Sequence, residues 1–399
     1  MNNANAWWAI RRRSWLALTV CALSYGGVSY AQSDVLAPEA PGRVTESVLH
    51  SFDGTDGANP VAGLLREDGG FYGTTSSGGA SNDGTVYRIT SRGTLTTLHS
   101  FSGPDGATPD AGLVQGRDGN FYGTTVYGGT NNDGTVYKIT PDGTLTTLFS
   151  FSGLDGAFPH GTLLLAGDGN FYGTTAGGGG GIGGGTVFKI TPGGTLTTLF
   201  AFGGPDGDTP LAGVIQGSDG SFYGTTYAGG HFGLGTVFML TPTTTGTLIT
   251  SVPFDGTNGA GPTDSVVEGS SGNFYGTATN GGASNGGTVF TITFGSPLTA
   301  LFSFSGPDGA NPVAGLLRDD GNFYGTTSAG GASHDGTVFK ITAGGTLTSL
   351  FSFDGTDGKT PEGVLVRVGQ GNFYGTTLNG GAYDDGTVFT LSVHPEPPQ

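Results

Sequence analysis

Cysteine and charged residues are scarce in this chain of 399 residues. The single cysteine, Cys21, lies in an apolar stretch near the N-terminus, so disulfides do not stabilise the rest of the protein. Only 11% of the residues are charged, with 14 Lys and Arg against 31 Asp and Glu. We therefore expect no nucleic-acid partner, because phosphate binding requires a basic surface. We also expect no membrane span, since no apolar run after residue 31 is long enough.

The first residues have the pattern of an export signal. Arg11, Arg12 and Arg13 precede an apolar run, 15–23, and small residues lead to a cleavage position after Ala31. The arginines also approximate a twin-arginine signal, so the sequence leaves that route and ordinary secretion open. Without this segment 11 basic residues are left, and the net charge is about −20. We expect an exported protein that is secreted, held at the cell surface or located in the periplasm.

A repeated tetrapeptide dominates the remainder of the chain. Phe-Tyr-Gly-Thr occurs seven times at intervals of 49 to 52 residues, beginning at Phe71, Phe121, Phe171, Phe222, Phe274, Phe323 and Phe373. The 81 glycines, together with aromatic and β-branched residues at fixed offsets, predict short strands and tight turns in each repeat. One such unit cannot bury its apolar face alone. A period of this length therefore predicts a β-propeller or a solenoid.

Each repeat predicts four strands. In the second repeat these are 111–114, 120–125, 135–140 and 144–151. An Asp-Gly pair between the first two favours a two-residue hairpin, because both residues accept a positive φ. The Ala-Gly-Leu segment that opens the repeat carries small residues suited to the crowded axis of a propeller, so we assign it to the innermost strand.

The phase of the repeat predicts how the ring closes. The longest link without a turn doublet runs from Phe151 to Pro159, so each blade begins near the proline. The chain then opens with an outer-type strand, 44–52, and ends after a third-type strand, 387–393. The sequence thus favours an all-β, seven-bladed propeller of four-stranded antiparallel blades, closed by the N-terminal strand, over a β-helix. The predicted segments are a signal peptide (1–31), a linker (32–43), the propeller (44–393) and a polar C-terminal tail (394–399).

The repeated segments resemble a known family. Asn-Phe-Tyr-Gly-Thr-Thr, the Gly-Gly pair after it, Gly-Thr-Val-Phe-Lys-Ile-Thr and Thr-Leu-Thr-Thr-Leu-Phe-Ser-Phe are together similar to the GloVer tandem repeat of exported bacterial proteins. The match covers residues 44–393. The resemblance implies an exported repeat protein of unknown activity; members of that family often end in a surface-anchoring segment, and none is seen in this sequence. The glycine pair after an apolar strand is also similar to a kelch blade, which implies no function.

Positions at which the repeats disagree are candidates for binding, because a residue needed only for folding should recur in every copy. In the glycine loops after Phe-Tyr-Gly-Thr the unusual side chains are Tyr127, Tyr227, His231, Phe232, His334 and Tyr383. Exposed aromatics can stack on sugar rings or anchor a protein, whereas local packing over a blade edge is the alternative, which we favour for Phe232. At the entrance of the inner strands, Asp110, His160 and Glu362 predict a polar patch at the mouth of the axial channel.

Two acidic turns suggest calcium as a candidate ion. Asp53 with Asp56, and Asp354 with Asp357, combine carboxylates with bendable backbone whose carbonyl groups can also be ligands. Neither turn matches an EF-hand loop, and aspartate before glycine is above all a turn former. The sequence indicates no other cofactor.

Taken together, these features favour a binding or adhesion module for glycan or protein, which we expect to be monomeric. The alternative is a carbohydrate-active hydrolase or lyase that uses acids at the channel mouth, such as Asp110 and Glu362. A structural envelope component without a discrete ligand is the third possibility. The arrangement of the off-consensus residues separates the three: an aromatic cluster favours binding, two facing acids favour catalysis, and dispersion favours a structural role.

Overall fold

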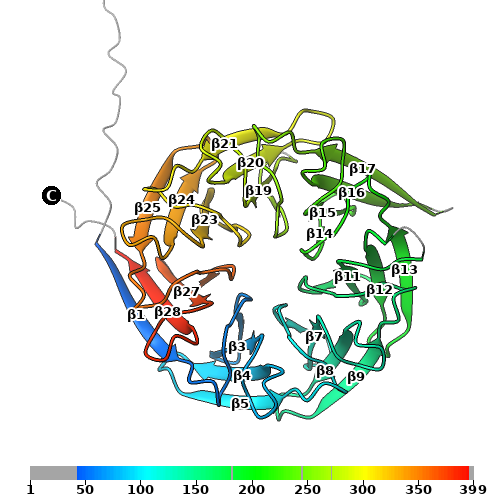
Figure 1. Ribbon diagram of the computed structural model, residues 1–399, viewed down its shortest axis with the longest axis horizontal. Coiled ribbons are helices and arrows are strands. Elements are labelled where there is room, and N and C mark those ends of the chain that lie inside the picture. The colour runs from blue at the N-terminus through cyan, green and yellow to red at the C-terminus, as the bar shows by residue number, and fades with distance from the viewer. Residues whose placement is uncertain (1–42, 181–182, 244–245, 271, 395–399) are drawn as a thin grey trace, which may run out of the picture. The chain divides into compact units, whose positions relative to one another are not determined.

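Seven antiparallel sheets form the described part of the chain. The structure is a computed structural model that describes residues 43–394 except 181–182, 244–245 and 271, so the predicted signal peptide, nearly all of the linker and most of the tail lie outside it. Within the described residues every regular element is a strand, and each sheet has four strands. The sheets are arranged as blades around an axis (Figure 1). The all-β, seven-bladed propeller is thereby confirmed. This part of the chain holds no helix with the length and hydrophobicity of a membrane span.

The blades are numbered in chain order, and their strands are given from the axis outward. Blade 1 contains β2 (Leu65–Glu67), β3 (Gly70–Thr75), β4 (Thr85–Thr90) and β5 (Leu95–Ser100), and blade 2 contains β6 (Val114–Gln115), β7 (Phe121–Thr125), β8 (Thr135–Ile139) and β9 (Leu145–Ser150). Blade 3 contains β10 (Leu164–Leu165), β11 (Phe171–Thr175), β12 (Thr186–Ile190) and β13 (Leu196–Ala201), and blade 4 contains β14 (Ile215–Gln216), β15 (Phe222–Thr226), β16 (Thr236–Thr243) and β17 (Gly246–Pro253). Blade 5 contains β18 (Val267–Glu268), β19 (Phe274–Ala278), β20 (Thr288–Ile292) and β21 (Thr299–Ser303), and blade 6 contains β22 (Leu317–Asp319), β23 (Asn322–Thr327), β24 (Thr337–Thr342) and β25 (Leu347–Ser352). Blade 7 contains β26 (Val366–Arg367), β27 (Asn372–Thr377), β28 (Thr387–Val393) and β1 (Val44–Ser51).

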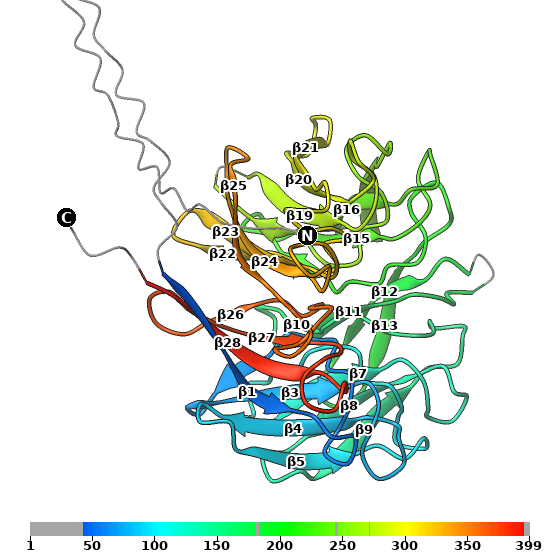
Figure 2. The ribbon, with the colours of Figure 1, turned by 60° about the vertical axis from the view of Figure 1, so that its left-hand side comes forward.

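The first and last strands of the described residues meet in blade 7. Strand β1 pairs antiparallel with β28 from Val44 opposite Val393 to Ser51 opposite Thr387. Figures 1 and 2 show the two strands side by side, blue against red. Blade 7 therefore takes its outer strand from the start of the described chain and its other three from the end.

Aromatic rings join each blade to the next. The tyrosine of every Phe-Tyr-Gly-Thr block packs on the phenylalanine of the following blade; Tyr122, for example, lies 4.1 Å from Phe171 between ring centroids. The seventh pair joins blade 7 to blade 1, with Tyr374 4.4 Å from Phe71. The buried core accordingly consists of seven clusters, each shared by two neighbouring blades. Such ring contacts add about 0.5–1.5 kcal/mol per pair beyond the area that they bury.

The glycine and threonine of the same block also have packing roles. A Cβ on Gly173 would lie 2.6 Å from Cζ of Phe188 on the adjacent strand, so no larger residue fits without a shift. Thr74 Oγ1 donates a hydrogen bond to the carbonyl of Ala111 in the next blade at 2.9 Å. The block recurs because each of its positions contacts a neighbouring strand or blade.

The innermost strands differ from the sequence prediction. Strand β6 holds only two residues, and 111–113 precede it as irregular backbone along the axis. The assignment of 111–114 to a strand was therefore wrong for three of its four residues. The reason lies in the hydrogen bonding: the backbone N–H of Gly112 donates to Thr162 Oγ1 of the next blade at 2.9 Å.

The predicted two-residue hairpin occurs in blades 1 and 6, where Asp68 and Asp320 have φ of 48° and 46°. In blade 2 it does not form. The second repeat has one more residue between its inner segment and Phe121 than the first repeat has before Phe71. Asp118 instead accepts a hydrogen bond from the backbone N–H two residues later, at 3.2 Å.

Candidate functional site

Two loops of each blade are hydrogen-bonded together at one end of the ring. In blade 1 the link before the inner segment and the glycine loop after β3 are joined by Gly79 N–H to Gly54 O at 2.8 Å. The same bond occurs in the other six blades. The first glycine of the pair, Gly78, has φ of 75°, and a Cβ there would lie 2.6 Å from the backbone nitrogen of Ala58. The Gly-Gly pair is thus required by this close approach. The links and the glycine loops therefore lie at the same end of the ring, which we call the long-loop end; the opposite end is the tight-turn end.

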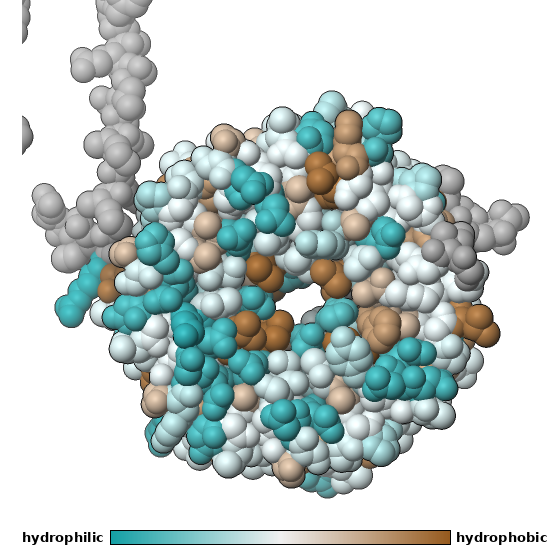
Figure 3. Space-filling view, viewed as in Figure 1, coloured by the Kyte–Doolittle hydropathy of each residue, from teal (hydrophilic) through white to brown (hydrophobic). Residues whose placement is uncertain are grey.

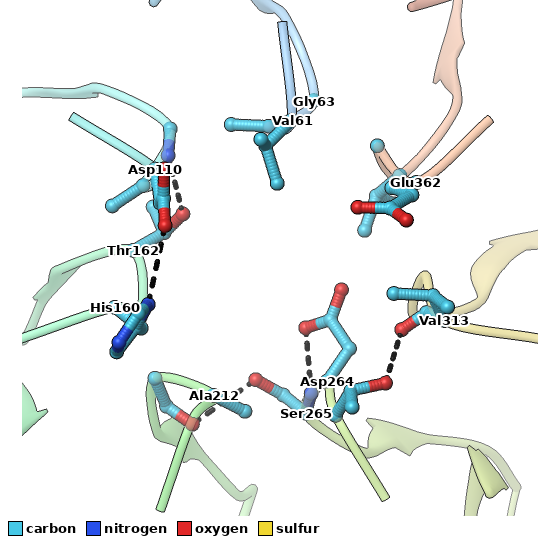
Figure 4. Close-up of a pocket in the computed structure, with 18 of the residues that line it drawn as sticks. Val61, Gly63, Asp110, His160, Thr162, Ala212, Asp264, Ser265, Val313 and Glu362 are labelled. Atoms are coloured by element: carbon cyan, nitrogen blue, oxygen red, sulfur yellow. Dashed lines mark hydrogen bonds and ion pairs between the residues drawn. The ribbon is translucent and has the colours of Figure 1, made fainter. Parts of the chain in front are cut away.

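A cavity of about 500 Å³ lies on the axis, lined by the irregular segments at the start of all seven blades. Figure 3 shows that the centre of the ring is open and that both apolar and hydrophilic side chains border it. Its titratable side chains are Asp110, His160, Asp264 and Glu362 (Figure 4). Val61, Leu211 and Val313 are apolar residues of the same lining.

The structure brings the three polar residues predicted at the channel mouth into this one cavity. Asp110 and His160 follow the proline of blades 2 and 3, and Asp110 Oδ2 lies 3.3 Å from His160 Nδ1. Glu362 occupies the same position in blade 7.

Glu362 differs from Asp110 in having no protein partner. Within the described residues no group hydrogen-bonds to its carboxylate, which points into the open centre in Figure 4. Burial raises the pKa of Glu362, the negative charge of Asp110 acts in the same direction, and together they bring it to about 7. At neutral pH this carboxyl group is therefore poised between its two protonation states.

The sequence prediction missed Asp264 in blade 5. Its carboxylate accepts hydrogen bonds from the backbone N–H of Ser265 at 2.6 Å and of Gly315, in blade 6, at 2.7 Å. Burial in the channel raises its pKa, although these two donors act in the opposite direction. The signal was present in the sequence, since the other six repeats have alanine or glycine at this position: Ala62, Ala111, Gly161, Ala212, Ala314 and Gly363.

The predicted aromatic side chains do not converge. They lie in the glycine loops of blades 2, 4, 6 and 7, and among the six the one ring contact in the described residues is that of His231 with Phe232, at 4.7 Å. The largest of them are exposed: Tyr383 by 64%, Phe232 by 55%, Tyr127 by 44% and Tyr227 by 40%. Tyr127 also contacts Phe158 of the next link, with 5.6 Å between centroids. His334 is exposed, and its φ is 68°. Local packing, which we favoured for Phe232, does not cover that side chain.

The acidic turns proposed for calcium use their carboxylates within the turn. Oδ1 of Asp53 accepts hydrogen bonds from the backbone N–H and the hydroxyl of the threonine two residues later, and Oδ1 of Asp354 does the same. Asp56 and Asp357 each accept one from the backbone N–H of the first aspartate. In the part of the chain that the structure describes, no three His, Cys, Asp or Glu side chains are grouped to hold a metal ion. Calcium binding stays a prediction.

Residues 282–286 read Gly-Ala-Ser-Asn-Gly, which matches the letters of a hydrolase nucleophile motif. They form the exposed glycine loop between β19 and β20, whereas the motif requires a turn from a strand into a helix. Ser284 is therefore not a nucleophile at an elbow.

Fold and cavity define a tandem-repeat β-propeller with a polar pocket on its axis. The chain belongs to the family described as the Gloeobacter/Verrucomicrobia repeat, which matches residues 24–228 and 212–396. This confirms the family resemblance of the repeats. No curated protein matches the sequence.

Several solved structures are similar to this chain, and two of them, with TM-scores of 0.50 or more, share the fold. A puromycin-hydrolyzing peptidase of Mycobacterium tuberculosis matches with a TM-score of 0.55 and 12% identity, over 90% of this chain and 57% of that one. PorZ of Porphyromonas gingivalis, a surface component of the type-IX secretion system, matches with a TM-score of 0.50 and 14% identity, over 86% of this chain and 48% of that one. A protein of unknown function from Dyadobacter fermentans matches with a TM-score of 0.48 and 14% identity, over 89% of this chain and 100% of that one. The chain thus spans about half the length of the first two, and at these identities the likeness shows the fold alone.

Proposed function

We propose that this protein is an exported binding module that takes a glycan or protein ligand at the long-loop end of the ring, with the axial cavity as its main contact. The observation that carries the proposal is the convergence of four titratable side chains, from blades 2, 3, 5 and 7, in one cavity. All four stand at positions where the repeats disagree. A side chain needed for folding would recur in every copy, as the stacked phenylalanines do. The cavity also has a size typical of small-ligand pockets.

Export is part of the proposal, and two observations support it. The first residues have the composition of a signal peptide, and the family resemblance implies exported proteins. Acidic side chains with little basic surface suit a soluble module outside the cell. Proteomics of secreted, surface and periplasmic fractions tests this point, and N-terminal sequencing of the mature protein locates the cut predicted after Ala31.

The first experiment is a screen of residues 32–399 against a glycan array and a peptide array. Saturable binding to a restricted set is expected, and Glu362→Gln should weaken it. Glu67→Gln is the matched control, because Glu67 ends β2 at the tight-turn end and does not line the cavity. Loss of binding in Tyr227→Ala with full binding in Glu362→Gln would move the site to the loops. Runs with calcium and with a chelator test the acidic turns in parallel.

A second candidate function is that of a carbohydrate-active hydrolase or lyase. The observation that favours it is the raised pKa of Glu362, about 7, in a cavity shared with Asp110. A carboxylic acid that retains its proton near neutral pH is suited to general acid catalysis. Incubation with the glycans that bind, followed by product analysis, separates the two: cleavage that is lost in Glu362→Gln supports an enzyme, and intact glycan supports a binding module.

A structural envelope role is the third candidate, and the dispersed loop aromatics favour it. It is the expected conclusion if neither array shows saturable binding and no glycan is cleaved.

A further inference from the structure

The cavity wall offers hydrogen-bond acceptors but few free donors. In the described part of the chain no lysine or arginine lines it, and the imidazole of His160 lies against Asp110. The carboxylates of Asp264 and Glu362 face the cavity without a positively charged partner among the described residues. A carboxylate held away from water is stabilised by a cation that enters beside it.

The hydroxyl groups of the wall are already engaged with the protein. Thr263 Oγ1 donates to the carbonyl of Val313 at 2.8 Å, and Ser265 Oγ donates to the carbonyl of Gly213 at 3.1 Å. Thr162 Oγ1 accepts from the N–H of Gly112 at 2.9 Å. Thr263 and Ser265 therefore do not present free protons to the oxygen atoms of a sugar, whereas Thr162, as an acceptor, keeps its own proton. A ligand that supplies donors and needs no acceptor partner fits this wall better, and an ammonium group has three donors and no acceptor.

The apolar side chains at the mouth describe the rest of the ligand. Val61, Leu211 and Val313 occupy, in blades 1, 4 and 6, the position that Asp110, His160 and Glu362 occupy in blades 2, 3 and 7. A group that passes this mouth contacts aliphatic carbon and carboxylate at once. An aliphatic chain with a charged end makes both contacts.

We propose that the axial cavity binds an alkylammonium group, that is, an aliphatic chain ending in a protonated amine. The inference rests on the proposed binding function and names its ligand class. The group can come from a free small amine or from a lysine side chain of a protein partner, and both sources present the same chemistry to Asp264 and Glu362.

Calorimetric titration of residues 32–399 with matched probes tests this. Pentylamine is compared with pentanol, and a tripeptide with a central lysine is compared with its acetyl-lysine counterpart. We expect the charged member of at least one pair to bind at least tenfold more tightly than its neutral partner. Glu362→Gln and Asp264→Asn should each reduce that preference severalfold, while Glu67→Gln should keep it. Asp264→Asn can disturb two backbone hydrogen bonds, so the melting temperature of this variant is measured first. If Asp264→Asn is unfolded, the test rests on Glu362→Gln alone.

The outcomes separate the sources and the hypotheses. Preference for pentylamine supports a small amine, and preference for the lysine peptide alone supports a partner's side chain. Equal binding of charged and neutral probes, or a preference that survives in Glu362→Gln and in a folded Asp264→Asn, overturns the inference. Binding of a neutral glycan that depends on Glu362 overturns it while leaving the proposed function intact. Absence of binding by the amine probes and on both arrays overturns both.

The pH dependence gives an independent readout. Between pH 5 and 8 Glu362 loses its proton, so amine affinity should rise across this range. The titratable side chains of Asp110, His160 and Asp264 face the same cavity, so the contribution of Glu362 is the part of the rise that Glu362→Gln removes. An affinity that falls with rising pH in the parent protein would contradict the proposal.

Discussion

The interior of the blades and the lining of the axial cavity are built from the same repeat, yet the seven copies agree in one region and disagree in the other. Between blades every copy has the stacked phenylalanine and tyrosine, and every copy has the threonine that ends the Phe-Tyr-Gly-Thr block. At the cavity mouth the equivalent residue is valine in two blades, and leucine, threonine, aspartate, histidine or glutamate in the others.

The difference follows from what each region must satisfy. An interior position contacts two sheets, so its size and shape are restricted by neighbours on both sides. A mouth position lies on irregular backbone ahead of a strand of two or three residues, and its side chain faces an open cavity. Substitution there changes the lining of the cavity at little expense to the fold. The predictions below test this division.

Deletion of 44–52 should have the largest effect. It removes β1, takes away the outer partner of β28 and so exposes the outer edge of blade 7. We expect aggregation or loss of a cooperative melting transition, measured by thermal denaturation with light scattering. Ser47→Ala, an exposed change in the same strand, is the control. A deletion variant that melts like the parent protein would show that β1 is dispensable.

Gly173→Ala should destabilise the protein by roughly 1–3 kcal/mol, because the added methyl group overlaps the ring of Phe188. Gly167→Ala is the matched control: no atom lies within 4 Å of its added Cβ. Urea denaturation of the two variants measures the difference. Equal stability of both would mean that the blade interior is less restricted than the repeat suggests.

Glu362→Gln should raise stability above neutral pH by roughly 1–2 kcal/mol, with solvent in the channel limiting the gain. The pKa of Glu362 is about 7 in the folded protein against 4.5 for an unperturbed glutamate, so the folded state binds the proton more tightly than the unfolded state. Stability from this group is present below pH 4.5 and is lost as the pH rises through 7. The melting temperature, measured from pH 4 to 8, should therefore change less with pH in the variant than in the parent protein.

Glu46 in β1 has the same raised pKa, about 7, because it is partly buried and lies near the charges of Asp357 and Asp354. It should therefore leave part of the pH slope in Glu362→Gln, and a double variant with Glu46→Gln should remove more of it. If the melting temperature of Glu362→Gln changed with pH as much as that of the parent protein, this would contradict the burial of the Glu362 carboxyl group.

Tyr87→Phe should have the smallest effect, a stabilisation of about 1 kcal/mol or less. The Tyr87 hydroxyl is buried without a hydrogen-bond partner in the described residues, and five other repeats have phenylalanine at this position. The reverse change, Phe188→Tyr, should destabilise by a similar amount. Chemical denaturation of both variants provides the measurement, and a destabilised Tyr87→Phe would indicate that the hydroxyl has an unseen partner.

Regular features of the fold were predictable because they are local or periodic. Seven copies of Phe-Tyr-Gly-Thr indicate seven units, and alternation of strands with glycine turns indicates antiparallel blades. The inner strands were less predictable: 111–113 have strand-like composition, but a hydrogen bond from Gly112 to the neighbouring blade competes with the ladder. The hairpin in blade 2 failed for a reason visible in the sequence, the one additional residue before Phe121.

The candidate site was predictable only in part. Comparison of repeats identified Asp110, His160 and Glu362, and it would have identified Asp264 had the next position been compared as well. The same comparison also selected the loop aromatics, which lie on separate blades. A position at which the repeats differ is one that folding does not restrict to a single residue type. The sequence does not tell which of these differing side chains lie close together in the folded protein.

The sequence by itself determined the number of blades, the family, the acidic charge and the loops that must contain glycine, because each of these depends on composition or on a period along the chain. Only the tertiary structure decided that side chains from blades 2, 3, 5 and 7 line one cavity, that the wall hydroxyls are already bonded and that Glu362 has no partner among the described residues. Those properties depend on how far each blade reaches toward the axis, which is set by packing between sheets and not by the order of residues within one.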